Sequence, residues 1–102
     1  MVQTQSQIAR EVGRRIQKFR ATTGVSARVL AECADMDLTN YQRIERGRGN
    51  PTISTLLQIA VALEVDVGEL VTGLGVDDLQ NGRLPYGYTE LPQRRRSTRV
   101  VY

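Results

Sequence analysis

The chain has 102 residues, of which 40% are hydrophobic and 25% are charged, and its formal net charge is +3. This composition is typical of a globular protein with room for one small domain and a tail. There is no histidine and a single cysteine, Cys33, which excludes an internal disulfide, a zinc site of the usual Cys/His kind and a histidine-activated nucleophile. Residues 1–10 lack an apolar signal core, and no apolar run reaches the roughly 18 residues of a membrane span.

These exclusions, together with the lack of a glycine-rich phosphate loop, predict a protein that is not an enzyme and that needs no metal or other cofactor. We expect no small-molecule ligand and no membrane association, and a cytoplasmic location follows by default. Cys33 falls inside a predicted helix and is expected to be a small, partly buried and unreactive side chain.

The charges are unevenly distributed along the chain. Residues 1–72 carry nine basic and eight acidic groups, and residues 73–102 carry five and three. Within the first segment, three arginines lie close together and three acids lie well downstream: Arg43, Arg46 and Arg48 against Glu64, Asp66 and Glu69. A basic face opposite an acidic one favours a polyanionic partner, although most charge clusters are simply solvated.

The first predicted helix runs from about residue 6 to residue 22. Its apolar side chains recur four, four and three residues apart and form one stripe, which comprises Ile8, Val12, Ile16 and Phe19. Gly24 is expected to end the helix, because glycine adopts the left-handed conformation without strain. Ser26 is a good N-terminal cap for a second helix over residues 27–34, whose inward face is formed by Leu30, Ala31 and Ala34.

A tight turn is predicted at residues 35–37. Asp35 is the candidate for a left-handed backbone, because aspartate tolerates that region better than most residues other than glycine. Asp37 can cap the next helix, which is predicted over residues 38–46 with Tyr41 and Ile44 facing the core. The side chains expected to face outward are Leu38, Thr39, Asn40, Gln42 and Arg43.

Two further helices complete the predicted domain. Gly47 ends the preceding helix, and a loop over residues 48–51 follows. Thr52 is expected to cap a helix over residues 53–63, whose inward side chains are Leu56, Ile59, Ala60 and Leu63. After a turn at residues 64–66, Asp66 is expected to cap a last short helix over residues 67–72. The sequence therefore predicts an all-α domain of five helices over residues 1–72, without a convincing strand.

Residues 73–102 are predicted to form an irregular C-terminal tail. The segment holds two of the three prolines and no sustained helical stripe, although residues 100–102 could pair as a short strand. Its apolar side chains are too many for a plain linker, so we expect some of them to pack on the domain, on a second subunit or on another protein. Its basic run over residues 94–99 is expected to be solvated rather than to form an arm on DNA.

Residues 26–47 combine the three features that a DNA-reading helix-turn-helix needs. These are two helices joined by a tight turn, short polar side chains at the start of the second helix, and basic or amide groups beside it. Thr39 and Asn40 are short and polar, and Arg43 lies one turn further on with the reach for a bidentate contact to guanine. Arg46 and Arg48 follow, where phosphate contacts are expected. The sequence therefore predicts binding to the major groove of double-stranded DNA.

The segment IERGRGNPTISTLLQIAVAL, residues 44–63, resembles a string typical of the lambda-repressor-like, Cro/CI-type helix-turn-helix family, also called XRE. The resemblance covers about residues 8–72 and implies a five-helix domain that binds operator DNA, commonly as a homodimer on a palindrome. It also implies an ion pair between Arg20 and Glu45. The base-reading positions that it implies are Leu38, Thr39, Asn40 and Arg43, and the phosphate-contacting positions are Ala27 or Arg28, Gln42, Arg46 and the backbone N–H of Thr52.

The sequence departs from the family pattern at four positions. Ala27 and Leu38 stand where the family often has glutamine. Arg28 is therefore expected to replace Ala27 at the phosphate, and Leu38 to pack on a thymine methyl group rather than to hydrogen-bond a base. Asp35 and Glu64 stand where the family has glycine. Base recognition is thus expected to depend on Thr39, Asn40 and Arg43.

Two functions stay open at this point. The first is a sequence-specific transcriptional regulator, expected to be a repressor, that binds DNA as a homodimer. Its dimer contacts are expected on the last helix and the start of the tail, at Val67, Leu70, Val71, Leu74 and Leu79. The second is an antitoxin-like or adaptor protein whose domain binds DNA while its tail binds a protein partner. An enzyme is the third and least favoured class.

Overall fold

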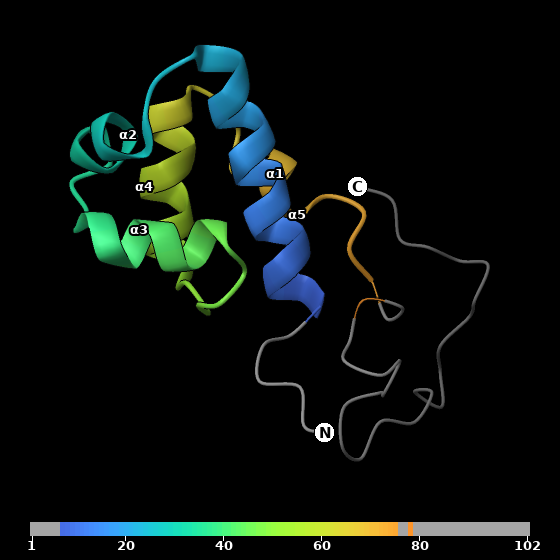
Figure 1. Ribbon diagram of the computed structural model, residues 1–102. Coiled ribbons are helices and arrows are strands. Elements are labelled where there is room, and N and C mark those ends of the chain that lie inside the picture. The colour runs from blue at the N-terminus through green and yellow to red at the C-terminus, as the bar shows by residue number, and fades with distance from the viewer. Residues whose placement is uncertain (1–6, 76–77, 79–102) are drawn as a thin grey trace, which may run out of the picture.

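The computed structural model describes residues 7–75 and residue 78, and these residues form five helices and no strand (Figure 1). The helices are α1 (Gln7–Thr23), α2 (Ala27–Cys33), α3 (Leu38–Glu45), α4 (Ile53–Leu63) and α5 (Gly68–Val71). The predicted all-α, five-helix architecture is therefore confirmed. The strand considered at residues 100–102 and the predicted dimer contact Leu79 lie outside the described residues. Within the described ranges, no helix is long and apolar enough to cross a membrane.

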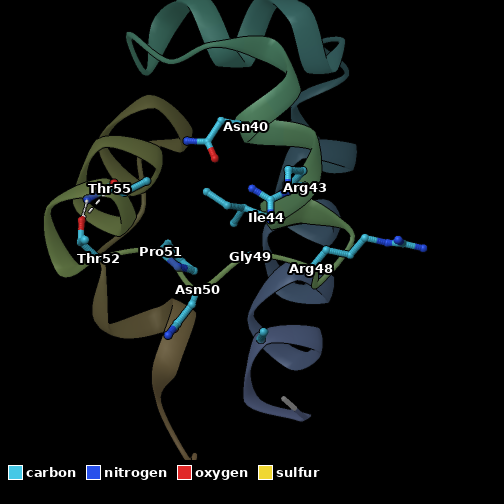
Figure 2. Close-up of a pocket in the computed structure, with 10 residues that line it drawn as sticks. Asn40, Arg43, Ile44, Arg48, Gly49, Asn50, Pro51, Thr52 and Thr55 are labelled. Atoms are coloured by element: carbon cyan, nitrogen blue, oxygen red, sulfur yellow. Dashed lines mark hydrogen bonds between the residues drawn. The ribbon is translucent and has the colours of Figure 1, made fainter. Parts of the chain in front are cut away.

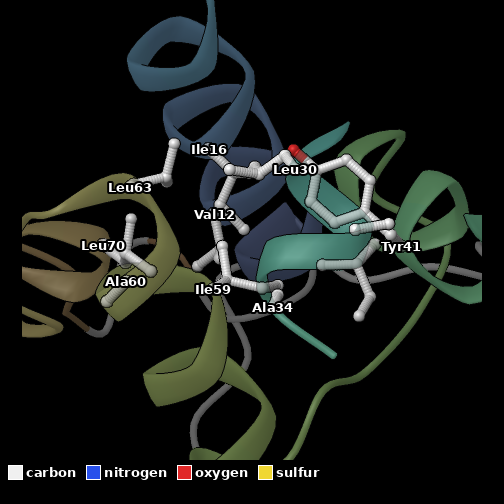
Figure 3. Packing of buried hydrophobic residues seen from close by; sticks show 11 residues of the cluster. Val12, Ile16, Leu30, Ala34, Tyr41, Ile59, Ala60, Leu63 and Leu70 are labelled. Atoms are coloured by element: carbon white, nitrogen blue, oxygen red, sulfur yellow. The ribbon is translucent and has the colours of Figure 1, made fainter. Parts of the chain in front are cut away.

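The hydrophobic core lies where α1, α2, α3 and α4 meet, and α5 closes it against α1 (Figure 3). Ile16 of α1, Tyr41 of α3 and Ile59 of α4 are each fully buried. The predicted inward stripes supply most of this core, whose other buried members are Val12, Leu30, Ala31, Ala34, Ile44, Ala60, Leu63 and Leu70. Because α1 packs on α3 and α4 packs on α2, the core fixes the orientation of α3 from behind.

Three of the helices end in the same backbone arrangement. After α2, Asp35 has a left-handed backbone with φ of 58°, and the N–H of Met36 donates to the carbonyl of Ala31 at 2.9 Å. This is the Schellman motif, which satisfies carbonyls left free at a helix end. The same pattern recurs at Gly47 after α3 and at Glu64 after α4, where φ is 76° and 63°. The left-handed turn predicted at Asp35 is confirmed.

Side-chain caps begin three of the helices as the sequence predicts. The side-chain oxygens of Ser26, Asp37 and Thr52 each accept a backbone N–H three residues further on, at 3.1 Å in every case. The predicted cap at Asp66 is wrong, because α5 begins only at Gly68 and has no side-chain cap. The backbone carbonyl of Asp66 instead accepts the N–H of Glu69 at 2.9 Å, which closes the first turn without the carboxylate.

Two burial predictions also need correction. Cys33 is exposed rather than partly buried, because the buried side of α2 is formed by Leu30 and Ala31 and Cys33 lies away from it. Leu70 was expected to contact a second subunit but is 0% exposed. The packing of α5 against α1 places Leu70 in the protomer's own core, so its side chain is not available to a partner.

Candidate nucleic-acid interface

The C-terminal half of α3 is held against α1 at very short range. Gly13 in the middle of α1 faces the carbonyl oxygens of Ile44 and Glu45, and a Cβ atom at this position would lie 2.6 Å from both. Only glycine permits so close an approach of two backbones. A second close approach follows at Gly47, where a Cβ would lie 2.7 Å from the Cα of Arg10.

A charged network joins the same two helices. The Nε of Arg20 lies 2.6 Å from one carboxylate oxygen of Glu45, and a second guanidinium nitrogen donates to the other oxygen at 3.2 Å. The Tyr41 hydroxyl donates to Glu45 at 2.7 Å, and Arg20 also donates to the carbonyl of Val25 at 2.9 Å. The ion pair that the family resemblance implies is therefore present, in bidentate form, and it ties α1, the α1–α2 loop and α3 together.

The network changes the acid–base behaviour of its members. The hydrogen bond from Arg20 to Glu45 raises the pKa of the guanidinium above its ordinary value. Burial raises the pKa of the Tyr41 hydroxyl far above that of a free tyrosine, and its hydrogen bond to Glu45 adds to the rise. Arg20 therefore stays charged and the Tyr41 hydroxyl stays protonated across the physiological pH range.

The turn between α2 and α3 is braced from α4. The side-chain amide of Gln58 donates to the carbonyl of Ala34 at 2.8 Å. This carbonyl belongs to the C-terminal cap of α2 and would otherwise have no helical partner. The α2–α3 pair is thus held by its own Schellman turn at Asp35 and by a hydrogen bond from the helix behind it.

The outward side of α3 is left open by this anchoring. Thr39, Asn40, Arg43 and Arg46 are all exposed. Thr39, Arg43 and Arg46 follow one another at intervals of four and three residues, so they share one edge of the helix. Within the described part of the chain, none of these four side chains makes a hydrogen bond that would hold it away from a ligand.

A groove separates α3 from the first turn of α4. It encloses about 520 Å³, and its polar lining consists of Asn40, Arg43, Arg48, Asn50, Thr52 and Thr55. Figure 2 shows Asn40 and Arg43 on α3 facing the start of α4, with Arg48 extending outward from the loop. The described lining contains two arginines and no acid, and Thr52 and Thr55 bring the N-terminus of α4 to its edge. This is the electrostatic setting that suits a phosphate.

The structure brings together only part of the residue set expected from sequence. Asn40, Arg43, Arg48 and Thr52 line the groove, whereas Thr39 and Arg46 lie on the exposed edge of α3 outside it. Leu38 and Gln42 are half-buried, and Leu38 packs against the core. Arg28 is exposed on α2, away from the groove lining.

The structural roles of two residues were not predicted from the sequence. Gly13 interrupts a helix without a turn or an end nearby, and such an isolated glycine commonly marks a close packing contact, so a signal was available. Gln58 lies on α4 among apolar residues, and its bond to Ala34 depends on a tertiary distance that no local pattern reveals. Both residues position the motif rather than contact a ligand.

Of the predicted dimer contacts on and near α5 that fall among the described residues, one is exposed. Val71 is 40% exposed, whereas Val67 and Leu74 are half-buried and pack against the core. No group of three or more potential metal ligands occurs within the described ranges.

The fold and this surface define a helix-turn-helix protein, since a Schellman turn joins two short helices and the second presents a polar, basic edge backed by a fixed core. A family model described as "Helix-turn-helix domain" matches residues 11–78. The chain therefore belongs to this helix-turn-helix family, in agreement with the Cro/CI-type resemblance of the sequence.

Curated relatives and solved structures agree with this assignment. The chain is 30% identical over 78 residues to the HTH-type transcriptional regulator DdrOP3 of Deinococcus deserti, covering 76% of this chain and 60% of the relative. It is 30% identical over 70 residues to the cryptic phage CTXphi transcriptional repressor RstR of Vibrio cholerae, covering 69% and 62%. The matches thus span about three fifths of these relatives' lengths.

Among solved structures, the chain is similar to SinR of Bacillus subtilis, a master regulator for biofilm formation crystallised in complex with DNA. The identity is 35% and the TM-score 0.56, and the match covers 58% of this chain and 95% of the SinR chain. The lambda-repressor-like fold expected from the sequence is confirmed by this similarity and by the five-helix architecture.

Proposed function

We propose that this protein is a sequence-specific DNA-binding transcriptional regulator, and that it represses transcription by occupying an operator. One observation carries the proposal: the polar edge of α3 is exposed, while its opposite side is locked to α1 by Gly13 and the Arg20–Glu45 pair. A rigid, outward-facing helix of this kind is what reading base edges in the major groove requires. The repressor named among the relatives supports the direction of regulation.

In the proposed complex the first two turns of α3 lie in the major groove. Arg43 makes a bidentate contact to guanine, Asn40 pairs with the edge of adenine, and Thr39 contacts a neighbouring base. Leu38 contributes through apolar contact with a thymine methyl group at the edge of the groove. Because Leu38 is already half-buried in the core, its part in base recognition is smaller than that of Arg43.

Phosphate contacts surround this reading edge. Arg48 and the N-terminus of α4 at Thr52 border the groove beside α3 and take one phosphate of the backbone. Arg46 extends the exposed edge of α3 toward the same strand, and Arg28 on α2 and Gln42 contact the flanking phosphates. These contacts set the position and salt dependence of binding, whereas the bases set the sequence preference.

The regulator acts as a homodimer on a palindromic operator. A single module of this kind buries only about 600–1,000 Å² on DNA, which is too little for strong specificity. Two copies reading half-sites about one DNA turn apart solve this problem. The adaptor alternative rests on a protein partner bound by the tail, and almost all of that tail lies outside the described residues.

Selection of bound DNA from a random pool tests the proposal. The expected result is an enriched half-site of about four base pairs, repeated in inverted orientation with centres about 10 base pairs apart. Binding that enriches no sequence, with an affinity that depends on salt alone, would contradict a sequence-specific regulator and leave a non-specific DNA-binding adaptor.

A further inference from the structure

An unpartnered apolar surface lies on the side of α4 that faces away from the core. Ile53, Leu57 and Val61 follow one another at intervals of four residues and are 81%, 50% and 66% exposed. A helix in a monomeric protein normally turns charged or polar side chains to solvent on this side. The sequence of α4, ISTLLQIAVAL, contains no charged residue, so this helix has the composition of one that is covered on both sides.

A second stripe on α2 joins this surface. Val29, which is 43% exposed, and Cys33 lie one helical turn apart on α2. Cys33 lines two shallow hollows, one shared with Leu57 and Val61 and the other shared with Val29. The α2–α4 patch, as we define it, therefore runs without interruption over both helices and consists of Val29, Cys33, Ile53, Leu57 and Val61.

We propose that the α2–α4 patch is the surface through which two copies of this chain associate, in place of the α5 contacts suggested by the sequence. This inference rests on the proposed function, since it names the partner that the operator-bound form requires. The α5 alternative is weaker, because among its contacts that the structure describes Leu70 is in the core, Val67 and Leu74 pack against the core, and Val71 alone is exposed.

Position favours a second copy as the occupant. Thr52 lines the DNA-facing groove at the start of α4, and Ile53, the next residue, begins the patch. A two-fold axis beside α4 therefore places both reading helices on the same side of the dimer, as binding to one face of DNA demands. A symmetric contact sets each patch against its own copy, and the absence of charge on α4 avoids repulsion there. The described acids at the rim are Asp35 and Glu64.

The size of the patch also favours a second copy over an independent protein. Five partly exposed side chains amount to a few hundred Å² of apolar surface, whereas a stable complex buries about 800 Å² on each partner. A partner held by this patch alone would bind weakly. A second copy gains the remainder from the DNA, because binding to adjacent half-sites brings the two patches to a high effective concentration. The dimer is thus weak in solution and strong on the operator.

The test compares two matched substitutions in the full-length protein. Val61→Glu places a charge in the patch at the end of α4 remote from the DNA, and Val71→Glu makes the same change on α5. Sedimentation equilibrium measures self-association, and titrations measure binding to DNA with one or two copies of the selected half-site. Val61→Glu is expected to weaken self-association and two-site binding at least tenfold while changing one-site binding less than twofold. Val71→Glu is expected to change none of the three.

The native cysteine supplies a second readout that does not depend on any substitution being tolerated. Cys33 is the sole cysteine of the sequence and lies within the patch. Its reaction with a maleimide should therefore slow at least fivefold when the protein is bound to two-site DNA, but not when it is bound to one-site DNA.

Two results would overturn the proposal. One is equal protection of Cys33 on both DNAs, and the other is loss of self-association in Val71→Glu while Val61→Glu is unaffected. Protection of Cys33 in a free monomer would also overturn it, because residues 79–102 would then cover the patch. Failure of the wild-type protein to bind either DNA with sequence preference would instead refute the proposed function.

Discussion

Gly13→Ala tests the close contact that sets the position of the reading helix. In an ordinary helix this change is favourable by about 1 kcal/mol, because alanine has the higher helix propensity. Here the new Cβ would lie 2.6 Å from two backbone carbonyl oxygens of α3, about 1 Å short of ordinary contact at ~3.5 Å. Because backbone carbonyl groups cannot rotate away as a flexible side chain can, α1 and α3 must separate.

The expected cost follows from these two opposing effects. Overpacking of a close contact costs about 1–3 kcal/mol, and the case of two backbone atoms lies at the upper end of this range. After the gain in propensity is subtracted, the free energy of unfolding should fall by about 1–2 kcal/mol. For a domain of this size, such a loss lowers the melting temperature by roughly 5–15 °C. DNA affinity should fall as well, because the separation tilts α3.

Gly68→Ala is the matched control. Gly68 also lies in a helix, and apart from its chain neighbours and the backbone of its own helix no atom lies within 4 Å of the position that its Cβ would take. This substitution should therefore leave stability unchanged or raise it by up to about 1 kcal/mol. Thermal and urea unfolding followed by circular dichroism measure both variants. A Gly13→Ala protein as stable as the Gly68→Ala protein would refute the close packing of α1 on α3.

Three further predictions concern the ionisable groups. Glu45→Gln should lower the free energy of unfolding, measured in urea, by about 2 kcal/mol, because it leaves Arg20 without its carboxylate partner in a partly buried site. An unchanged urea midpoint would count against a stabilising role of the Arg20–Glu45–Tyr41 network. The Tyr41 hydroxyl should stay protonated at about pH 11 and ionise only on unfolding. The absorbance of ionised tyrosine at that pH should therefore be the same in wild type and Tyr41→Phe while both are folded, and should become larger in wild type after denaturation. Hydrogen bonds from Arg14 and Arg15 lower the pKa of Glu11 from 4.5 to about 2. Since the folded value is the lower one, this contribution to stability is complete above pH 4.5 and is lost as the pH falls toward 2. Glu11→Gln should remove that part of the acid dependence of unfolding, and an identical acid profile would contradict the assignment.

Local signals predicted most of the fold because the elements of this domain follow local rules. Ser26, Asp37 and Thr52 each place a side-chain oxygen where free N–H groups begin a helix. Asp35 was the best available residue for a left-handed turn, and its φ of 58° confirms that choice. Glu64 is less obvious, since its left-handed backbone after α4 is fixed by the Schellman hydrogen bonds rather than by any preference of glutamate.

The burial predictions that are wrong concern residues whose exposure depends on contacts between distant segments of the chain. Leu70 lies in a helix of four residues, too short for a stripe to distinguish the core side from the solvent side. Its burial follows from the docking of α5 on α1, which Arg15 supports by donating to the carbonyl of Thr72 at 2.7 Å. Cys33 was misplaced for a related reason: it lies one helical turn from both the buried Leu30 and the exposed Val29, and in a helix of seven residues the local spacing does not decide between the two sides.

The candidate site likewise has features that the sequence could predict and one feature that depends on tertiary packing. Its anchor could be inferred, because the Arg20–Glu45 pair follows from the family resemblance and the two side chains meet at 2.6 Å. Its reading edge could be placed on α3 from the spacing of the core residues Tyr41 and Ile44. The groove between Asn40 and the start of α4 could not be foreseen, since its lining comes from α1, α3, the following loop and α4 and depends on how these segments are placed in space.

The central claim is that Arg43, held on the outward edge of an anchored α3, reads a base in the major groove. The most direct measurement is the binding of wild type and Arg43→Ala to the selected operator and to operators altered at each position. Arg15→Ala, which removes the same charge on the α5 side of α1, serves as the control. Arg43→Ala should lose about 1–3 kcal/mol of binding free energy on the selected operator and should no longer discriminate at one guanine, while Arg15→Ala should keep the full preference. An Arg43→Ala protein that binds more weakly to every sequence by the same factor, with its base preference intact, would contradict the claim.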